Sequence, residues 1–351
     1  MPETPETTPP GSAAPDGTRR RSVWELLDSY RGLIALFLVF LLGCIVTPRL
    51  RDTGLPIFLS PRTQLDLLFE YCEYGLLATG MTLVILTGGI DLSVGSVLGL
   101  CATLFALLTV GYGWAPIGAV LAVVGVGFLA GSINGILVAR FGMQPFVATL
   151  AMMTAARGAA KYISGGIKVQ PAAMPWYKLQ QDTPHFFRWM TTALPGLGIQ
   201  PASLLFLAAI ILMAIVVRRT VYGRKLYAIG GNEEASRLSG VGVAWAKGLT
   251  YALCAGFAGL AGVVNACRQD IGDPEAGAGF ELDAIAAVVI GGTSLAGGRG
   301  GMGFTFIGVL IIAYISKILS LKGVDIAQRM MIQGAIIAIA VLIQKRKRNG
   351  A

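Results

Sequence analysis

Long apolar runs separated by short polar segments dominate the pattern of this chain. A helix needs roughly 20 mainly apolar residues to cross a bilayer, and shorter runs are tolerated inside a bundle. This pattern predicts an all-α polytopic membrane protein with about ten transmembrane helices. The predicted spans are residues 32–47, 64–87, 93–112, 115–139, 145–165, 202–218, 245–267, 281–297, 302–320 and 327–344.

A polar, glycine-rich stretch, LTGGIDLSVGSVL at residues 86–98, separates two of these apolar runs. Its glycines allow a tight turn, and Asp91 and Ser93 can accept hydrogen bonds from the free N–H groups of the helix that follows. An isolated carboxylate is costly in hydrocarbon, so Asp91 either caps this helix at a boundary or belongs to a transport pathway. We favour a helix break toward the inner face, where Asp91 shapes the backbone and a gate.

The same glycine pattern recurs late in the chain. GG-x-x-L-x-x-G occupies residues 88–95 and again 291–298, each time after an apolar run. Glycine-interrupted segments in the two halves of a transporter point to its binding region. With 47 glycines in the chain, a chance match is the alternative. If the echo is real, the two stretches lie on the same side of the membrane.

Composition and charge exclude several classes of protein. A hydrophobic content of 54%, with 13% charged residues and a mean hydropathy of +0.68, does not suit a soluble globule. The net charge of +9 comes from short loops and termini, which predicts membrane orientation and not nucleic-acid binding. The scattered cysteines and the single histidine, His185, argue against a metal site, and we expect no cofactor. No nucleophile–base pair or phosphate loop indicates an enzyme.

The ends of the chain differ from the apolar middle. Residues 1–22 are rich in Pro, Thr and Glu and predict a disordered cytoplasmic tail, and residues 345–351 form a basic cytoplasmic tail. Residues 23–344 make a single transmembrane domain. Basic clusters near residues 218–225 and 345–348 place both termini in the cytoplasm.

Polar residues within the apolar runs either bond across helices or face a pathway. The candidates for a translocation pathway or gate are Thr82, Thr87, Asp91, Ser93, Asn134, Thr149 and Asn265.

The inner loop at residues 218–243 predicts a short helix. Asn232 suits its N-cap, Glu233 and Glu234 suit its positive N-terminus, and Gly240 suits the C′ position. So short a helix is not stable alone and must rest on its own membrane domain or on another protein. A bulky residue at Gly231 is expected to disturb it.

The outer connection at residues 268–280, RQDIGDPEAGAGF, is acidic and flexible. It either docks a soluble partner or is a solvated connection. The candidate docking residues are Arg268, Asp270, Asp273 and Glu275.

Four separated stretches carry a resemblance to a known family. They are GMTLVILTGGIDLSVGS (80–96), QPFVATLAMMTAARG (144–158), YGRKLYAIGGNEEASRLSGV (222–241) and ELDAIAAVVIGGTSLAGGRG (281–300). Their sequence and order resemble the permease subunit of ribose-type ABC sugar importers, from about residue 30 to residue 344.

The resemblance implies a type II importer permease in the cytoplasmic (inner) membrane of a bacterium. Two copies, a homodimer, would sit on two ABC ATPase subunits and receive a monosaccharide, a pentose or hexose, from an extracytoplasmic sugar-binding protein. Nucleosides or polyols are alternative solutes, and an ion-coupled secondary transporter is a further alternative. The residues matching the family's ATPase-coupling segment are Gly230, Gly231, Asn232, Glu233, Glu234, Ala235, Arg237, Leu238, Ser239 and Gly240.

Overall fold

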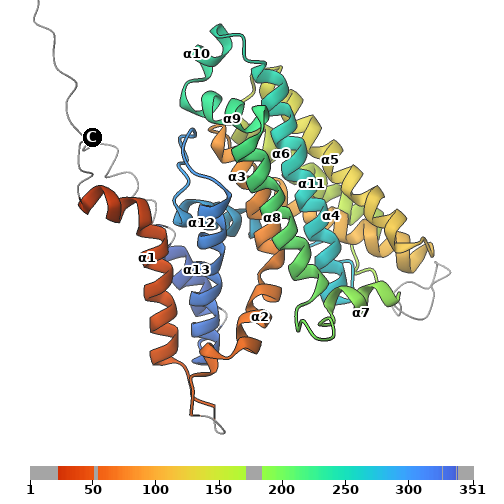
Figure 1. Cartoon of the computed structure of the whole chain (residues 1–351). Helices are drawn as coiled ribbons and strands as arrows, with labels where there is room; N and C mark the ends of the chain where they lie inside the picture. Colours follow the sequence, from red (N-terminus) through yellow and green to blue (C-terminus); the bar gives the residue numbers. More distant parts are fainter. Residues whose placement is uncertain (1–22, 51–53, 171–183, 326, 337, 339–351) are drawn as a thin grey trace, which may run out of the picture.

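The computed structural model describes residues 23–50, 54–170, 184–325, 327–336 and 338, and within these ranges it contains helices and no strands (Figure 1). The predicted all-α polytopic fold is thereby confirmed. The tails predicted at residues 1–22 and 345–351 lie outside the described ranges. The elements are α1 (Val23–Val46), η1 (Ile57–Leu59), α2 (Pro61–Glu70), α3 (Cys72–Leu86), α4 (Val94–Ala106), η2 (Leu107–Gly111), α5 (Pro116–Ala139), α6 (Pro145–Ser164), α7 (His185–Thr191), α8 (Pro201–Arg219), α9 (Val221–Gly231), α10 (Glu233–Leu238), α11 (Val243–Gln269), α12 (Phe280–Gly291) and α13 (Met302–Leu321).

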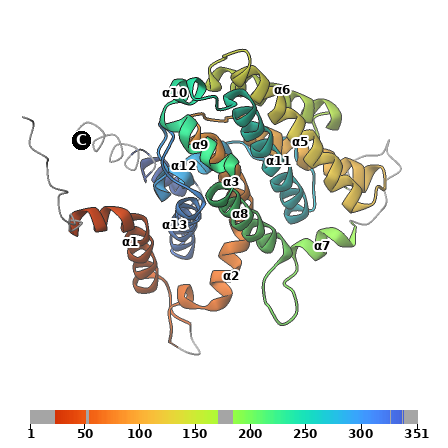
Figure 2. The same cartoon turned by 45° about the horizontal axis from the view of Figure 1, so that its top comes forward.

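Helix α11 is the centre of the bundle. It packs against α5, α4 and α3, while α1 lies at the edge beside α13 in both views (Figures 1 and 2). Gly127, Gly131 and Gly135 of α5 lie so close to the α11 backbone that a Cβ on any of them would overlap it. Small residues therefore allow the two helix backbones to approach closely.

The predicted spans at 64–87 and 281–297 depart most from the observed helices, α1 begins earlier than predicted at Val23, and the span at 327–344 lies partly outside the described residues. The run at residues 64–87 is divided at Tyr71, which has φ −105° and ψ 6° between α2 and α3. The run at 281–297 ends early, because Gly292 has φ 117° and stops α12 at Gly291. With twelve residues, α12 is about 18 Å long, which is shorter than the hydrocarbon core of a bilayer. Within the described ranges, α5, α8, α11, α13 and the combined α4–η2 helix have the length and hydropathy of membrane spans.

The connections gather at two opposite ends of the bundle, named here after the helices that lie there (Figure 1). The α10 end holds α9, α10 and the glycine-rich segments after α3 and α12. The α7 end holds α2, α7 and the connection between α11 and α12. This division separates the two regions that the sequence assigns to different partners.

A buried ion pair joins α3 and α11 nearer the α7 end. The Glu73 carboxylate, whose side chain is 2% exposed, accepts hydrogen bonds from Arg268 Nη1 at 2.6 Å and from Asn265 Nδ2 at 2.8 Å. Lys317 of α13 pairs with Glu70 at 2.6 Å. The sequence pattern points to Asp91 as the carboxylate at membrane depth. Glu73 is a second one, and α11 supplies its partners.

We predict that Arg268→Met destabilises the protein strongly. It would leave the buried Glu73 carboxylate without its cation, which costs about 3–5 kcal/mol in the free energy of unfolding. The double variant Glu73→Gln with Arg268→Met leaves no uncompensated charge and should regain part of this loss. The midpoint of thermal unfolding in detergent is the measurement. A single variant as stable as the wild type would contradict the prediction.

Candidate functional site

Helices α9 and α10 form a small unit at the α10 end, with α9 beside the end of α3 (Figure 2). Asn232 separates them in extended conformation, and its Oδ1 accepts a hydrogen bond from Ala235 N at 2.9 Å. Ser236 Oγ donates to the Asn232 carbonyl at 2.8 Å. Asn232 is therefore the N-cap of α10, as predicted from its position before two glutamates.

The C-terminus of α10 closes in a Schellman motif. Gly240 has φ 80°, its N–H donates to Arg237 O at 3.0 Å, and the Val241 N–H donates to Ser236 O at 3.0 Å. The predicted C′ role of Gly240 is confirmed, because only a residue tolerant of the left-handed region fits there. Both ends of this six-residue helix are thus fixed by local hydrogen bonds.

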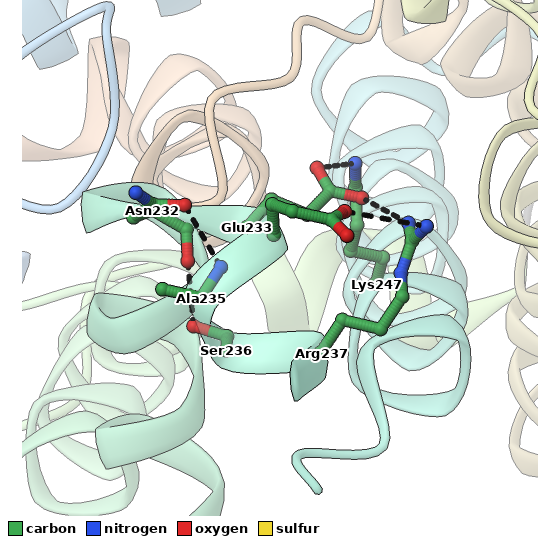
Figure 3. A network of polar contacts seen from close by, with 7 residues as sticks. Asn232, Glu233, Ala235, Ser236, Arg237 and Lys247 are labelled. Atoms are coloured by element: carbon green, nitrogen blue, oxygen red, sulfur yellow. Dashed lines mark hydrogen bonds and ion pairs between the residues drawn. The ribbon is translucent and has the colours of Figure 1, made fainter. Parts of the chain in front are cut away.

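One ion pair anchors α10 to the membrane bundle, and two more lie within α10 (Figure 3). Glu233 Oε2 lies 2.9 Å from Lys247 Nζ on α11, and the Lys247 side chain is only 11% exposed. Arg237 reaches Glu233 at 3.5 Å and Glu234 at 3.6 Å on the surface. Leu238 is 81% exposed at the end of the helix. The helix rests on its own membrane domain and presents an apolar tip and mixed charges outward.

Four glycines bring α9 against the two glycine-rich segments, and we call Gly88, Gly230, Gly297 and Gly298 the glycine junction. Gly298 N donates to the Leu86 carbonyl at 3.0 Å. A Cβ on Gly230 would overlap Leu86 O and Gly298 N, and one on Gly297 would crowd Gly88 and Gly230. The motif and its echo therefore meet on the same side of the bundle, as predicted. The sequence pattern does not indicate that α9 contacts both of these glycine-rich segments.

Of the two glycines that precede Asn232, Gly230 is the one whose surroundings leave no room for a side chain. Gly231 is exposed, and a Cβ placed on it would have no atom within 4 Å. Lack of space therefore gives no reason for a bulky residue at Gly231 to disturb the site, because that side of α9 faces away from the bundle. The expected effect of such a residue on transport stays a prediction.

Asp91 is fully buried at the break between α3 and α4. Its Oδ1 accepts hydrogen bonds from Ser93 N at 2.9 Å and Ser93 Oγ at 2.6 Å. Asn134 Nδ2 of α5 donates to the same Ser93 Oγ at 3.0 Å. Asp91 therefore shapes the turn before α4. Ser93 does not cap a helical N–H as expected; its hydroxyl links Asp91 to α5 instead.

The other candidate pathway residues are also buried, but they make separate contacts. Thr82 Oγ1 lies 2.6 Å from Thr305 Oγ1 across two helices, and Asn265 binds Glu73. Thr87 and Thr149 donate to carbonyls of Val84 and Pro145, each at 2.8 Å. The structure brings Asp91, Ser93 and Asn134 together and gives the remaining four other partners.

The acidic connection at the α7 end is largely neutralised within the chain. Asp273 pairs with Lys168 at 2.9 Å, and Glu275 pairs with Lys161 at 2.6 Å. The hydrogen bond from Lys161 lowers the pKa of Glu275. Asp270 is exposed at the end of α11, whereas Arg268 turns inward to Glu73. Sequence spacing does not reveal these lysine partners, because each lies more than a hundred residues from its carboxylate in the chain.

Comparison with known proteins gives the family. Residues 64–341 match a family model described as the permease component of branched-chain amino acid transport systems. This chain belongs to that permease family.

Several relatives align along most of this permease. It is 39% identical over 292 residues to the ribose import permease protein RbsC of Bacillus subtilis (strain 168), covering 83% of this chain and 87% of the relative. It is 38% identical to RbsC of Escherichia coli (strain K12), covering 88% and 93%. It is 31% identical to the L-arabinose ABC transporter permease protein AraH of Azospirillum brasilense, covering 97% and 94%. No solved structure matches it.

Family membership confirms a transport permease and not an enzyme. The permease is a multi-pass protein of the bacterial cytoplasmic membrane. Membership in an import permease family also implies an ABC ATPase and a substrate-binding protein as partners.

We predict opposite tolerance at the two neighbouring glycines of α9. Alanine normally stabilises a helix by up to about 1 kcal/mol relative to glycine. At Gly230 the added methyl group would push into the glycine junction, so Gly230→Ala should instead lose about 1–3 kcal/mol. Gly231→Ala is the matched control and should be neutral or stabilising. Thermal unfolding of the purified permease measures both. Equal stability of the two variants would show that the junction adapts freely.

Proposed function

We propose that this permease is the membrane subunit of an ATP-driven importer for a monosaccharide of the pentose or hexose class. The similarity to two permeases named for ribose and one named for L-arabinose, each along more than four fifths of this chain, carries the proposal. The alternative solutes, a nucleoside or a polyol, would require the same ATP-driven permease and the same kinds of partner.

In this proposal the α10 end faces the cytoplasm. The basic residues of α8 and α9 favour this orientation, because Lys and Arg are enriched in short cytoplasmic connections. Both chain termini then also lie in the cytoplasm. The basic residues at this end are Arg218, Arg219, Arg224, Lys225 and Arg237.

The α10 helix is the proposed contact with the ATPase. A capped helix with an exposed Leu238 offers a small apolar anchor with charges around it. Movement of α10 would reach α11 through the Glu233–Lys247 pair. A movement of α9 would displace the end of α3 as well, because the backbones of the glycine junction are in direct contact and cannot shift independently. The residues proposed for coupling are Gly230–Gly240, with the side chains of Glu233 and Leu238 foremost.

The pathway is proposed to pass the helix break. Asp91, Ser93 and Asn134 are buried in this conformation, so solute would meet them only after α3, α4 and α5 shift relative to one another. Thr82, Thr87, Thr149 and Asn265 remain proposed lining groups on the same condition. Hydroxyl and amide groups suit weak binding of a sugar, which a transit site must release.

The binding protein is proposed to dock at the α7 end on Asp270, Asp273 and Glu275. Docking there would exchange the Lys161 and Lys168 pairs for pairs with the partner. Exposed ion pairs are weak, so such an exchange costs little. A second copy of the permease completes the proposed complex as a homodimer.

Reconstitution tests the proposal directly. Proteoliposomes containing the permease, its ATPase and its binding protein should accumulate labelled ribose or arabinose only when ATP is present. An uncoupler at constant ATP should leave uptake unchanged. Uptake without the ATPase, or its collapse with the uncoupler, would favour an ion-coupled transporter instead.

We predict that Glu233→Arg lowers both ATP-driven uptake and stimulation of the ATPase by about tenfold or more, because it places a cation beside the nearly buried Lys247. The exchange variant Glu233→Lys with Lys247→Glu restores the attraction and should recover most of the coupling. Glu234→Arg, at an exposed position that does not contact Lys247, is the control for reversing one acidic charge at the surface of α10. Normal coupling in Glu233→Arg would show that the Glu233–Lys247 pair is not needed for coupling.

A further inference from the structure

The connection between α11 and α12 does not stay at the surface of the α7 end. Residues 270–279, named here the inserted segment, run beside α4 in the opposite direction. Gly272 lies against Ala106, and Gly277 lies against Gly95, eleven residues earlier in α4. At about 1.5 Å per helical residue, the segment descends about 16 Å along α4. It covers most of a helix that has the length of a membrane span.

Parts of this irregular backbone are buried at Gly272, Pro274 and Gly277, and buried backbone groups need hydrogen-bond partners. Near the α7 end, Gly272 exchanges two backbone hydrogen bonds with Val169, at 2.8 and 2.9 Å. Deeper in the bundle the carbonyl oxygens of Pro274 and Ala276 both accept from Nη1 of Arg157, at 2.5 and 2.8 Å. One guanidinium from α6 therefore satisfies the deeper part of the segment.

The other ties to α6 are weaker. The Lys161 and Glu275 side chains are 50% and 58% exposed, and Lys168 is 59% exposed, so solvent screens these pairs. Arg157 is partly buried and its guanidinium also lies against Gly99, where a side chain on α4 would exclude it. Hydrogen bonds from a charged donor in such surroundings are stronger than neutral ones.

We propose that Arg157 is the positioning residue that holds the inserted segment against α4 and α6 and so keeps the α7 end closed to solute. The tip of the segment supports a role in gating. Gly277 contacts Gly95, which is two residues after Ser93 at the helix break. Withdrawal of the segment would therefore free the start of α4 as well as the space beside it. The inference uses the proposed orientation, in which the α7 end faces outward.

Cysteine accessibility tests the inference in the full chain. Ala276→Cys is introduced alone and together with Arg157→Met, Arg157→Lys or Lys168→Gln, and spheroplasts are treated with a membrane-impermeant maleimide. Four native cysteines, Cys72, Cys101, Cys254 and Cys267, are buried, and the chain without the new cysteine gives the background. Arg157→Met should raise the labelling rate by about tenfold or more, because it removes two charge-assisted hydrogen bonds. Arg157→Lys, which keeps the charge without the planar fork, should lie in between.

Lys168→Gln is the matched control, since it breaks a tie of the same segment at the surface. Its labelling rate should stay within about twofold of the wild type. Each variant is also reconstituted without ATP, where Arg157→Met should let labelled sugar leak and Lys168→Gln should not. Thermal unfolding in detergent shows whether the variants are folded. Unchanged labelling in a folded Arg157→Met variant, or an equal rise in Lys168→Gln, would overturn the inference.

Two further cysteines separate this inference from the proposed orientation. Leu197→Cys lies in the exposed connection between α7 and α8, and Ser239→Cys is exposed after α10. The first should be labelled from outside and the second should not, whatever residue stands at position 157. The reverse pattern would refute the orientation, and the Ala276→Cys comparison would then be repeated on inverted vesicles to judge Arg157 by the same criterion.

Discussion

Most polar groups that enter this bundle bond to partners inside it, because hydrocarbon provides none. This constraint accounts for the three unusual features of the permease. Asp91 is held by Ser93, Glu73 is held by Arg268 and Asn265, and the carbonyls of the inserted segment are held by Arg157. In each case the polar group lies where a helix is interrupted or begins. The interruptions are tolerated because neighbouring helices supply the missing hydrogen bonds.

The parts of the structure that could be predicted are those set by residues close together in the chain. The caps of α10 follow from Asn232 and Gly240, each of which bonds to residues within five positions of itself. The helix break at Asp91 follows from local glycines in the same way. The membrane class follows from composition, which does not suit a soluble globule. Local chemistry thus predicted the proposed coupling helix more completely than any other part of the molecule.

The remaining features depend on contacts that sequence spacing cannot reveal. Glu73 and Arg268 are 195 positions apart, and Arg157 is 117 positions from Pro274. Hydropathy also predicts too long a helix at residues 281–297, because the average over an apolar window is not sensitive to a single glycine. Gly292 turns the chain there with φ 117°. Arg157 did leave a signal, since an arginine in an apolar run requires a buried partner. Nothing in the sequence indicates that this partner is backbone rather than a carboxylate.

Contacts from both ends of the molecule meet on either side of the helix break. From the α10 end, the glycine junction fixes α9 to Leu86, just before the break. From the α7 end, the inserted segment reaches Gly95, just after it. Both approaches are backbone to backbone, so neither has side chains that could absorb a displacement by changing rotamer. In the proposed function, a shift at either end would be taken up at the break, where Asp91, Ser93 and Asn134 are linked by hydrogen bonds instead of apolar packing. A buried carboxylate in this position costs stability, and in the proposed gate that cost would favour an open break, in which water could reach Asp91.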